Sequence, residues 1–205
     1  MEIYEDLVSY IPAPSRDCIT SVVLGKQSDC DSLINPVFLP YPIEYGEFAT
    51  LQLIWNHARY WQKPANFYYV HLKGITHAPG TALRRNVDGW RRVMSCLLFH
   101  DLDWNEGALD SHDCMGPLFD SFPLPHFSGN FWASTTHHIN RLSYPAYESD
   151  RFSTERWICS SGGNYVNLYP NEINRYEQYQ GVENISDPIK PISVRFAYRK
   201  KANGR

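Results

Sequence analysis

Hydrophobic positions recur with a helical period in three segments of the chain. Residues 47–60 and 86–100 carry apolar side chains every three or four positions, which is typical of helices with one buried face. Residues 2–11 show a shorter helical pattern that ends at Pro12. These three segments are the helices that the pattern predicts most directly.

Short runs rich in β-branched and aromatic residues separate the helical patterns and predict buried strands. They occupy residues 19–24, 66–74, 165–169 and 192–198. Shorter helices are expected at 135–142 and 155–160, and the polar stretch 101–113 is expected to be a loop. Since helices alternate with strands, the predicted fold is α/β, with a mixed, mostly parallel sheet flanked by helices.

The composition adds one unusual feature, a high aromatic content. Aromatic residues make up 15% of the chain, whereas the hydrophobic share of 43% is ordinary for a globular protein. Aromatic faces pack against the C–H faces of sugars and against nucleobases, so the excess points to such ligands. A tyrosine-rich core and rim explains it equally well. The length of 205 residues predicts a single domain.

Charge and cysteine content argue against several classes of protein. The net charge is −3 and the isoelectric point is near 6.2, so nucleic acid is not an expected partner. The five cysteines are scattered without a C-x-x-C pair, which argues against a disulfide framework or zinc site and for a reducing compartment. No signal-peptide pattern occurs, and no apolar run approaches the roughly 20 residues of a membrane span. A cytoplasmic protein is expected.

Candidate chemistry begins at the end of the predicted strand 66–74. His71 and Lys73 lie on one side of that strand, because side chains alternate, and Gly74 follows them. Ligands of open α/β sheets bind beyond the carboxyl ends of the strands. An ammonium group and a glycine N–H suit a phosphate or diphosphate. The alternative is a lysine in solvent and a histidine that caps a loop.

A second candidate lies at the start of the predicted helix 86–100. Arg91 and Arg92 follow Asp88 closely, and cations near a helix N-terminus oppose the helix dipole. A bound phosphate would compensate for this cost, and so would an acidic side chain. The second explanation is an ion pair, with Asp88, Glu44 or Glu47 as the partner.

Carboxylates in D-x-D patterns are candidate metal ligands. The patterns are Asp101-Leu102-Asp103 and Asp29-Cys30-Asp31, and Asp113 is a further isolated acid. Paired carboxylates can hold a divalent cation, Mn²⁺ or Mg²⁺, that bridges a diphosphate. The spacing also occurs by chance, and neither pattern follows a convincing strand.

The stretch 126–158 combines a turn motif with an acid beside a tryptophan. Gly129 and Asn130 precede Phe131 and Trp132, and Glu155 precedes Trp157. If the two motifs meet in space, they suit a sugar pocket in which an aromatic-walled carboxylate accepts a proton. The alternative for Glu155 is an acid that only stabilises a helix start.

Four motifs together resemble those of a group of small glycosyltransferases of the GT-A fold. They are Tyr69-x-His71-x-Lys73-Gly74, Asp88-Gly89-Trp90-Arg91, Gly129-Asn130-Phe131-Trp132 and Glu155-x-Trp157-Ile158. The chain is also similar in size to the N-terminal glycosyltransferase domain of a chlorovirus capsid-glycosylating protein, a GT-A domain that it resembles. The resemblance covers residues 47–158. It implies a GT-A-like, Rossmann-like single domain in which 1–45 is a partial nucleotide-binding portion and 190–205 a flexible basic tail.

The resemblance also implies roles for the motif residues. A nucleotide-sugar, such as a UDP-sugar, would be bound by His71, Lys73, Gly74, Arg91 and Asp88. The sugar or its acceptor, a glycan or glycoprotein hydroxyl, would contact Gly129, Asn130, Phe131, Trp132 and Trp157. The order of these motifs is similar to that of inverting β-1,4-galactosyltransferases, whose acidic motif supplies the catalytic base. By this comparison Glu155 would be the general base.

The sequence departs from the GT-A pattern at two places. GT-A enzymes usually carry D-x-D at the strand end where this chain has His71-Leu72-Lys73, so a lysine would replace the divalent cation. The chain also begins with a predicted helix rather than a nucleotide-binding strand. These departures keep two alternatives open: a non-catalytic carbohydrate- or nucleotide-binding module, and a hydrolase that pairs Glu155 with Asp150 or Asp113.

Overall fold

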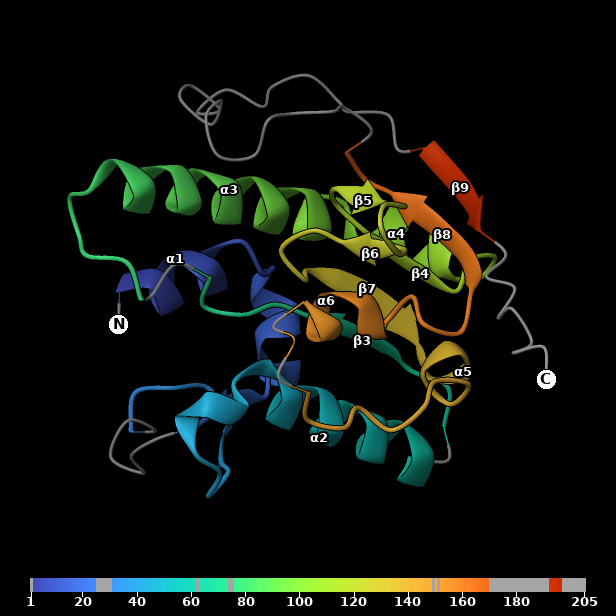
Figure 1. The fold of residues 1–205 in the computed structure, drawn as a ribbon, viewed down its shortest axis with the longest axis horizontal. Helices are drawn as coiled ribbons and strands as arrows, with labels where there is room; N and C mark the ends of the chain where they lie inside the picture. Colours follow the sequence, from blue (N-terminus) through green and yellow to red (C-terminus); the bar gives the residue numbers. More distant parts are fainter. Residues whose placement is uncertain are drawn as a thin grey trace.

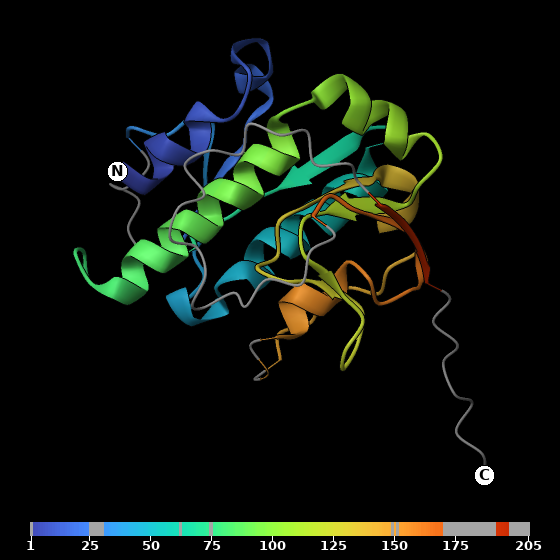
Figure 2. The same ribbon diagram turned by 90° about the horizontal axis from the view of Figure 1, so that it is seen from above.

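A five-stranded sheet lies between two layers of helices in the computed structural model of the chain (Figure 1). The structure describes residues 2–24, 31–61, 63–73, 76–148, 150, 152–169 and 192–196. α2, Glu47–Tyr60, and α3, Ala82–Phe99, cover opposite faces of the sheet and run in much the same direction (Figures 1 and 2). The prediction of a mixed α/β fold is confirmed.

The hydrophobic periodicity located the long helices well. α2 has the predicted bounds, and α1, Glu2–Ser9, confirms the shorter helical pattern. α3 begins four residues before its apolar pattern does, because Thr81 caps it by accepting a 3.1 Å hydrogen bond from the Arg84 N–H. A polar first turn therefore belongs to this helix.

The other helices within the described residues are short. They are α4, Leu102–Leu109; α5, Thr136–Ile139; α6, Ser153–Trp157; and the 3-10 turns η1, Ala13–Cys18, and η3, Ile43–Tyr45. The prediction of a loop over 101–113 is wrong, since α4 occupies most of it. Its polar sequence is helical because Asp101 caps it and only one side is buried, through Asn105 and Leu109.

The strands form one central sheet and two small ones. Across the central sheet the order is β3, Asn66–Tyr69; β7, Trp132–Thr135; β4, Cys114–Gly116; β8, Gly163–Asn167; and β9, Ile192–Phe196. The small sheets are β1, Ser21–Val23, with β2, Pro36–Phe38, and β5, Phe119–Asp120, with β6, His126–Phe127.

The central sheet is mixed rather than mostly parallel, so that part of the fold prediction is wrong. β7 is antiparallel to both β3 and β4, and β9 is antiparallel to β8; only β4 and β8 are parallel. The reason is the β5–β6 hairpin, which reverses the chain after β4 and returns it as β7 between β3 and β4. The sequence pattern contained no prediction of β7.

Strand β7 escaped prediction because it is buried on both faces. A strand with one exposed face alternates apolar and polar residues, whereas Trp132, Ala133 and Ser134 are all fully buried. The four residues also run directly into α5 without a turn signal. The strand at the centre of the fold therefore has the least distinctive sequence.

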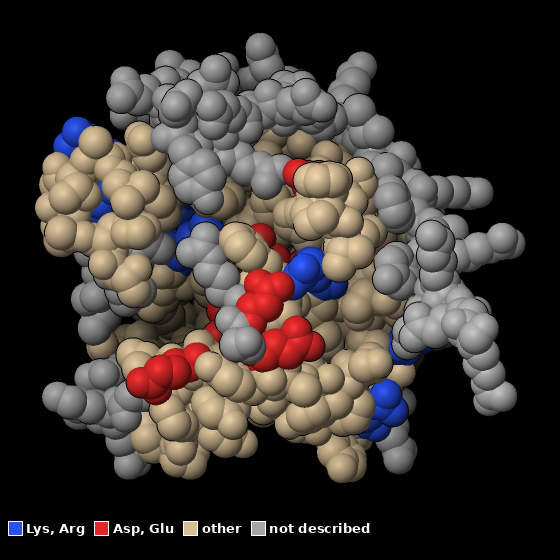
Figure 3. Space-filling view, in the orientation of Figure 1, with Lys and Arg blue, Asp and Glu red and all other residues tan. Residues whose placement is uncertain are grey.

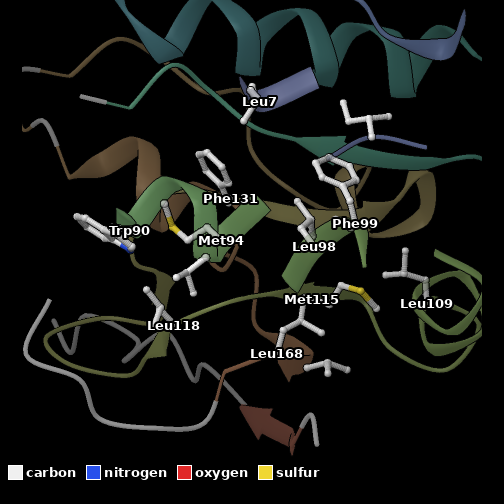
Figure 4. Packing of buried hydrophobic residues seen from close by; sticks show 14 residues of the cluster. Leu7, Trp90, Met94, Leu98, Phe99, Leu109, Met115, Leu118, Phe131 and Leu168 are labelled. Atoms are coloured by element: carbon white, nitrogen blue, oxygen red, sulfur yellow. The ribbon is translucent and has the colours of Figure 1, made fainter. Parts of the chain in front are cut away.

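Successive strand residues contribute to two separate cores. The core beneath α3 contains Phe131, Ala133, Met115, Val166 and Leu168. The core beneath α2 contains Trp132, Cys114, Tyr165 and Tyr69. This alternation is the two-residue period of a strand packed on both faces. Figure 4 shows the first core, in which Trp90, Met94 and Leu98 of α3 project toward the sheet.

The α3 core gives a direct test of the layer arrangement. Leu98→Ala removes a side chain with no exposed surface and is expected to lower the free energy of unfolding by about 2–5 kcal/mol. Leu83→Ala in the first turn of the same helix is the control, because Leu83 is 47% exposed and its change should stay within about 0.5 kcal/mol. Urea denaturation measures both, and equal losses would contradict the burial of Leu98.

Candidate functional site

The pairing of β3 with β7 brings two sequence motifs together. The strands are antiparallel and Tyr69 lies opposite Trp132, so residues that follow β3 meet residues that precede β7. His71 Nε2 accordingly donates a 2.8 Å hydrogen bond to the carbonyl oxygen of Gly129, 58 positions further along the chain. The motif predicted for diphosphate and the motif predicted for sugar share one site.

Gly129 is required at its position by backbone conformation and by packing. Its φ is +89°, and the turn closes with a 2.9 Å hydrogen bond from the Asn130 N–H to the Phe127 carbonyl. A Cβ atom on Gly129 would lie 2.7 Å from the sulfur of Met94. Any side chain would therefore strain the turn and push against α3.

Asn130 fixes this turn to the neighbouring layers. Its side chain is fully buried and its φ is +57°. Nδ2 donates a 2.5 Å hydrogen bond to Glu47 Oε2 at the start of α2, and Oδ1 accepts a 2.9 Å hydrogen bond from the Trp132 indole. Both ends of the buried amide are thus paired, which avoids the desolvation cost of an unsatisfied polar group.

Glu47 is the acid of this site, and no sequence motif assigned it a functional role. Its Oε2 also accepts a 3.2 Å hydrogen bond from the Tyr69 hydroxyl. Burial, followed by the charge of Glu47, raises the pKa of Tyr69 well above its usual value, so the phenol remains a donor. The only local signal is an acid at the first helical position after Gly46, a common pattern for stabilising a helix start.

The aromatic residues of the Gly129 motif lie in the core. Phe131 and Trp132 have no exposed surface. Trp132 stacks on Tyr69 with ring centroids 5.2 Å apart and contacts Trp157 with centroids 6.2 Å apart. These rings support the site from the interior side, and their direct contact with a sugar stays a prediction.

Lys73 and Arg91 are held near the end of β3 in different ways. Lys73 Nζ lies 4.2 Å from the ring centroid of Trp90, a cation–π contact. The Arg91 side chain is only 3% exposed and donates a 3.0 Å hydrogen bond to the backbone carbonyl of Lys73. Two carboxylates neutralise its charge, Asp88 at 2.6 Å and Asp6 at 3.0 Å. Arg91 therefore anchors the loop that carries Lys73.

Asp88 binds Arg84 as well as Arg91. Burial alone would raise the pKa of Asp88, but hydrogen bonds from the two guanidinium groups outweigh burial and lower it. Ion pairing was one of the two explanations offered for Arg91, and the structure adds Asp6 as a partner. Donor binding by Asp88 and Arg91 stays a prediction, and Gly74 lies outside the described residues.

Glu155 lies on the first turn of α6, a helix that packs against β6 just before the Gly129 turn. Its side chain is half-buried. It forms no hydrogen bond or ion pair with any residue that the structure describes. Neither carboxylate oxygen of Glu155 is therefore engaged by a donor within the described part of the chain.

A pocket of about 500 Å³ opens beside α6. Its wall includes aromatic rings, a carboxylate and a guanidinium, from Phe48, Tyr144, Trp157, Glu148 and Arg156. Figure 3 shows acidic side chains gathered near the middle of the face on which α6 lies, with basic side chains beside them. Arg156 forms an ion pair with Asp150. Glu155 is adjacent in sequence to this pocket but does not line it.

The acids considered as metal ligands lie apart from this pocket. Asp101 caps α4 by accepting a 3.0 Å hydrogen bond from the Trp104 N–H, and Asp103 is exposed on the first turn of the same helix. Within the described part of the chain, no group of three or more His, Cys, Asp or Glu residues could hold a metal ion. Asp29 lies outside the described residues.

Asp113 belongs to a polar cluster around the buried His138. Asp113 accepts hydrogen bonds from Arg141 at 2.6 Å and from the Asn164 N–H at 2.9 Å. His138 Nδ1 accepts from Arg141 at 2.8 Å, while Nε2 donates to the Ile158 carbonyl at 2.7 Å. The imidazole is therefore neutral. Burial lowers its pKa, although the Asp113 carboxylate 3.8 Å away opposes this effect.

These observations define a class of protein: a three-layer α/β domain with a polar site where β3 ends and β7 begins. The chain belongs to the family described as domain of unknown function DUF8361, whose profile matches residues 39–156. That range contains Glu47, His71, the Gly129 turn and Glu155. No curated protein and no solved structure matches the chain. In the described residues, every helix is too short or too polar to cross a bilayer.

Two neighbouring arginines test whether the Asp6–Arg91–Asp88 network is structural. Arg91→Ala would leave two carboxylates without their buried partner, and we expect a loss of about 3–5 kcal/mol in the free energy of unfolding. Arg92→Ala is the matched control: Arg92 also binds Asp6, but its side chain is 57% exposed, so about 1 kcal/mol or less is expected. Similar losses in the two variants, measured by urea denaturation, would argue against this difference.

His138 predicts an acid-sensitive contribution to stability. Its pKa is lowered on folding, so the unfolded chain binds the proton more readily, and stability is lost as the pH falls below about 6.5. His138→Gln retains a donor and an acceptor but cannot be protonated. The fall in unfolding free energy between pH 7 and pH 5 should be smaller in this variant, by up to about 1.4 kcal/mol per pH unit. The control is His100→Gln, at an exposed position. Its unfolding free energy should fall between pH 7 and pH 5 by as much as that of the wild-type protein.

Proposed function

We propose that this domain transfers a sugar from a nucleotide-sugar to a hydroxyl acceptor, with Glu155 as the general base. One observation supports the proposal most: the two motifs of the 126–158 stretch pack together, with the rings of Trp132 and Trp157 6.2 Å apart. The helix that carries Glu155 lies against β6, which leads into the Gly129 turn. The GT-A-like arrangement is part of this proposal.

The pocket beside α6 suits a sugar acceptor. Its volume of about 500 Å³ lies within the range of small-molecule sites, roughly 300–1,000 Å³. Phe48, Tyr144 and Trp157 offer apolar faces for the C–H side of a ring, and Glu148 and Arg156 offer partners for hydroxyls. A glycan or glycoprotein hydroxyl bound here would lie beside the turn of α6 that carries Glu155.

The chemistry then follows a single displacement. Glu155 accepts the proton of the acceptor hydroxyl, and the oxygen bonds to the anomeric carbon of the donor sugar. The bond from that carbon to the diphosphate oxygen breaks, so the configuration inverts and a nucleoside diphosphate leaves. Lys73 would stabilise the charge that develops on the diphosphate.

The side chains that directly follow β3 do not supply the oxygen ligands of a divalent cation. Mn²⁺ and Mg²⁺ of this kind of site bind oxygen ligands, whereas β3 leads into an imidazole and an ammonium group, those of His71 and Lys73. Arg91 and Asp88 neutralise one another, and Arg91 also donates a hydrogen bond to the Lys73 carbonyl. No step of the proposed reaction therefore depends on a metal ion.

The second candidate is a binding module that holds a carbohydrate without transferring it. The observation in its favour is that Glu155 does not line the pocket. A thermal-shift screen of nucleotide-sugars, nucleoside diphosphates and free sugars separates the two. A transferase is stabilised by nucleotide-sugars, by about 2.7 kcal/mol at 100 times the dissociation constant. Stabilisation by free sugars without any effect of nucleotides would identify a module.

Glu155→Gln tests the assigned base. The variant keeps the shape of the side chain but cannot take the proton, so we expect transfer to fall by about 10²–10⁴. Donor affinity, measured by calorimetry, should be unchanged. Glu106→Gln, at an exposed position on α4, serves as the control and should transfer at the wild-type rate. Full turnover in the Glu155 variant would rule out this base.

A further inference from the structure

Glu47 and His71 form a polar pair whose facing atoms do not hydrogen-bond to each other. His71 Nδ1 lies 3.8 Å from Glu47 Oε1, which is too long for a direct hydrogen bond. Among the described residues, Oε1 accepts no hydrogen bond, while Oε2 accepts two. The side chains of Glu47 and His71 are 28% and 21% exposed, so both are partly open to solvent.

The hydrogen bonding of His71 decides which groups can bind between His71 and Glu47. The Gly129 carbonyl can only accept, so the imidazole carries a hydrogen on Nε2. In the neutral ring Nδ1 then carries a lone pair and can only accept a hydrogen bond. It faces Oε1 of Glu47, which is also an acceptor. Two acceptors that face each other need O–H donors between them. When the ring is protonated, one hydroxyl can accept from Nδ1 and donate to Oε1.

A hydroxyl oxygen can lie about 2.8 Å from both atoms at once, since the two atoms are only 3.8 Å apart. A single hydroxyl satisfies both atoms only when the imidazole is protonated, because a hydroxyl donates one hydrogen. We propose that Glu47 and His71 bind hydroxyl groups of a carbohydrate ring. Neighbouring hydroxyls on one ring supply two donors to the neutral pair. A phosphate, by contrast, would be repelled by the Glu47 carboxylate.

The surrounding contacts hold the pair in place for this role. Asn130 and Tyr69 bind Oε2 and so direct Oε1 toward His71. The His71 ring is fixed by Gly129 and packs edge-on against Phe131, with centroids 5.4 Å apart. The pair is therefore preorganised by partners that are themselves buried or constrained.

The pair is connected to the pocket beside α6. Phe48, the residue after Glu47, lines that pocket. Asn130 joins Glu47 to Trp132, whose ring contacts Trp157 of α6. The inference rests on the proposed function in that the ring hydroxyls belong to the donor of that reaction, either to its transferred sugar or to the ribose of its nucleotide.

The experiment follows the ring nitrogens of His71 by NMR in the full chain. The probes are glucose, galactose, mannose, fucose, rhamnose and xylose, and separately UDP, GDP and their 2′-deoxy counterparts. At least one probe should shift the His71 signals. A shift by free sugars assigns the transferred sugar, and a shift by UDP or GDP that is lost with the deoxy form assigns the ribose. No shift with any probe would overturn the proposal.

Glu47→Gln tests the acceptor directly. A hydrogen bond to a charged group is typically worth about 1.5–3 kcal/mol, so affinity for the active probe should fall by about tenfold or more. Glu44→Gln, three residues earlier and exposed, is the matched control and should bind as wild type does. Wild-type affinity in the Glu47 variant would refute the role of its carboxylate.

A second variant keeps the test decisive if Glu47→Gln unfolds. His71→Gln retains the polar contact toward Gly129 but removes Nδ1, and it should weaken the same probe by calorimetry without changing the melting temperature by more than a few degrees. Unchanged affinity in a folded His71→Gln protein would also refute the pair. The binding result is independent of turnover. Binding at His71 without transfer from any donor would reject the transferase and keep the carbohydrate site. Loss of activity in Glu155→Gln without any His71 shift would keep the transferase and reject the carbohydrate site.

Discussion

The buried amide of Asn130 is the interaction on which the site depends. In the low-dielectric interior an unpaired amide costs free energy. A buried hydrogen-bond network therefore stabilises the fold only when each of its polar groups has a partner. Asn130 meets that requirement by joining Glu47 of α2 to Trp132 of β7. The turn, the sheet and one helix layer are thereby held in a single arrangement. Glu47 is in turn oriented toward His71. Contacts in the interior therefore fix the geometry of the partly exposed Glu47–His71 pair.

Much of the fold could be predicted from local periodicity. α2 and α3 have one buried face each, and the 3.6-residue pattern of apolar positions marks them directly. β7 could not be predicted in this way, because both of its faces are buried and it contains no turn signal. The error in strand direction followed from the same omission, since the reversed strand in the middle of the sheet was not recognised.

The candidate site was predictable only in part. The Tyr69–Gly74 and Gly129–Trp132 motifs were chosen for their residue types, and the structure brings His71 and Gly129 into contact. Glu47 was not chosen, because its relation to Asn130 spans 83 positions and is created by the folded chain alone. Arg91 illustrates a further limit: two arginines adjacent in sequence differ from 3% to 57% in exposure. Sequence indicates which groups are capable of chemistry, whereas burial decides which of them are occupied with structure.

The Arg91 network and the pairing of β4 have a consequence for where the folding unit ends. The family profile spans residues 39–156, yet Asp6 of α1 supplies one of the two carboxylates of Arg91 and β8 pairs with β4. A fragment trimmed to the profile would hold a buried guanidinium with half of its countercharge. It would also expose the backbone edge of β4, a surface prone to pairing with other chains. The segment that defines the family in sequence is smaller than the segment needed to close the fold.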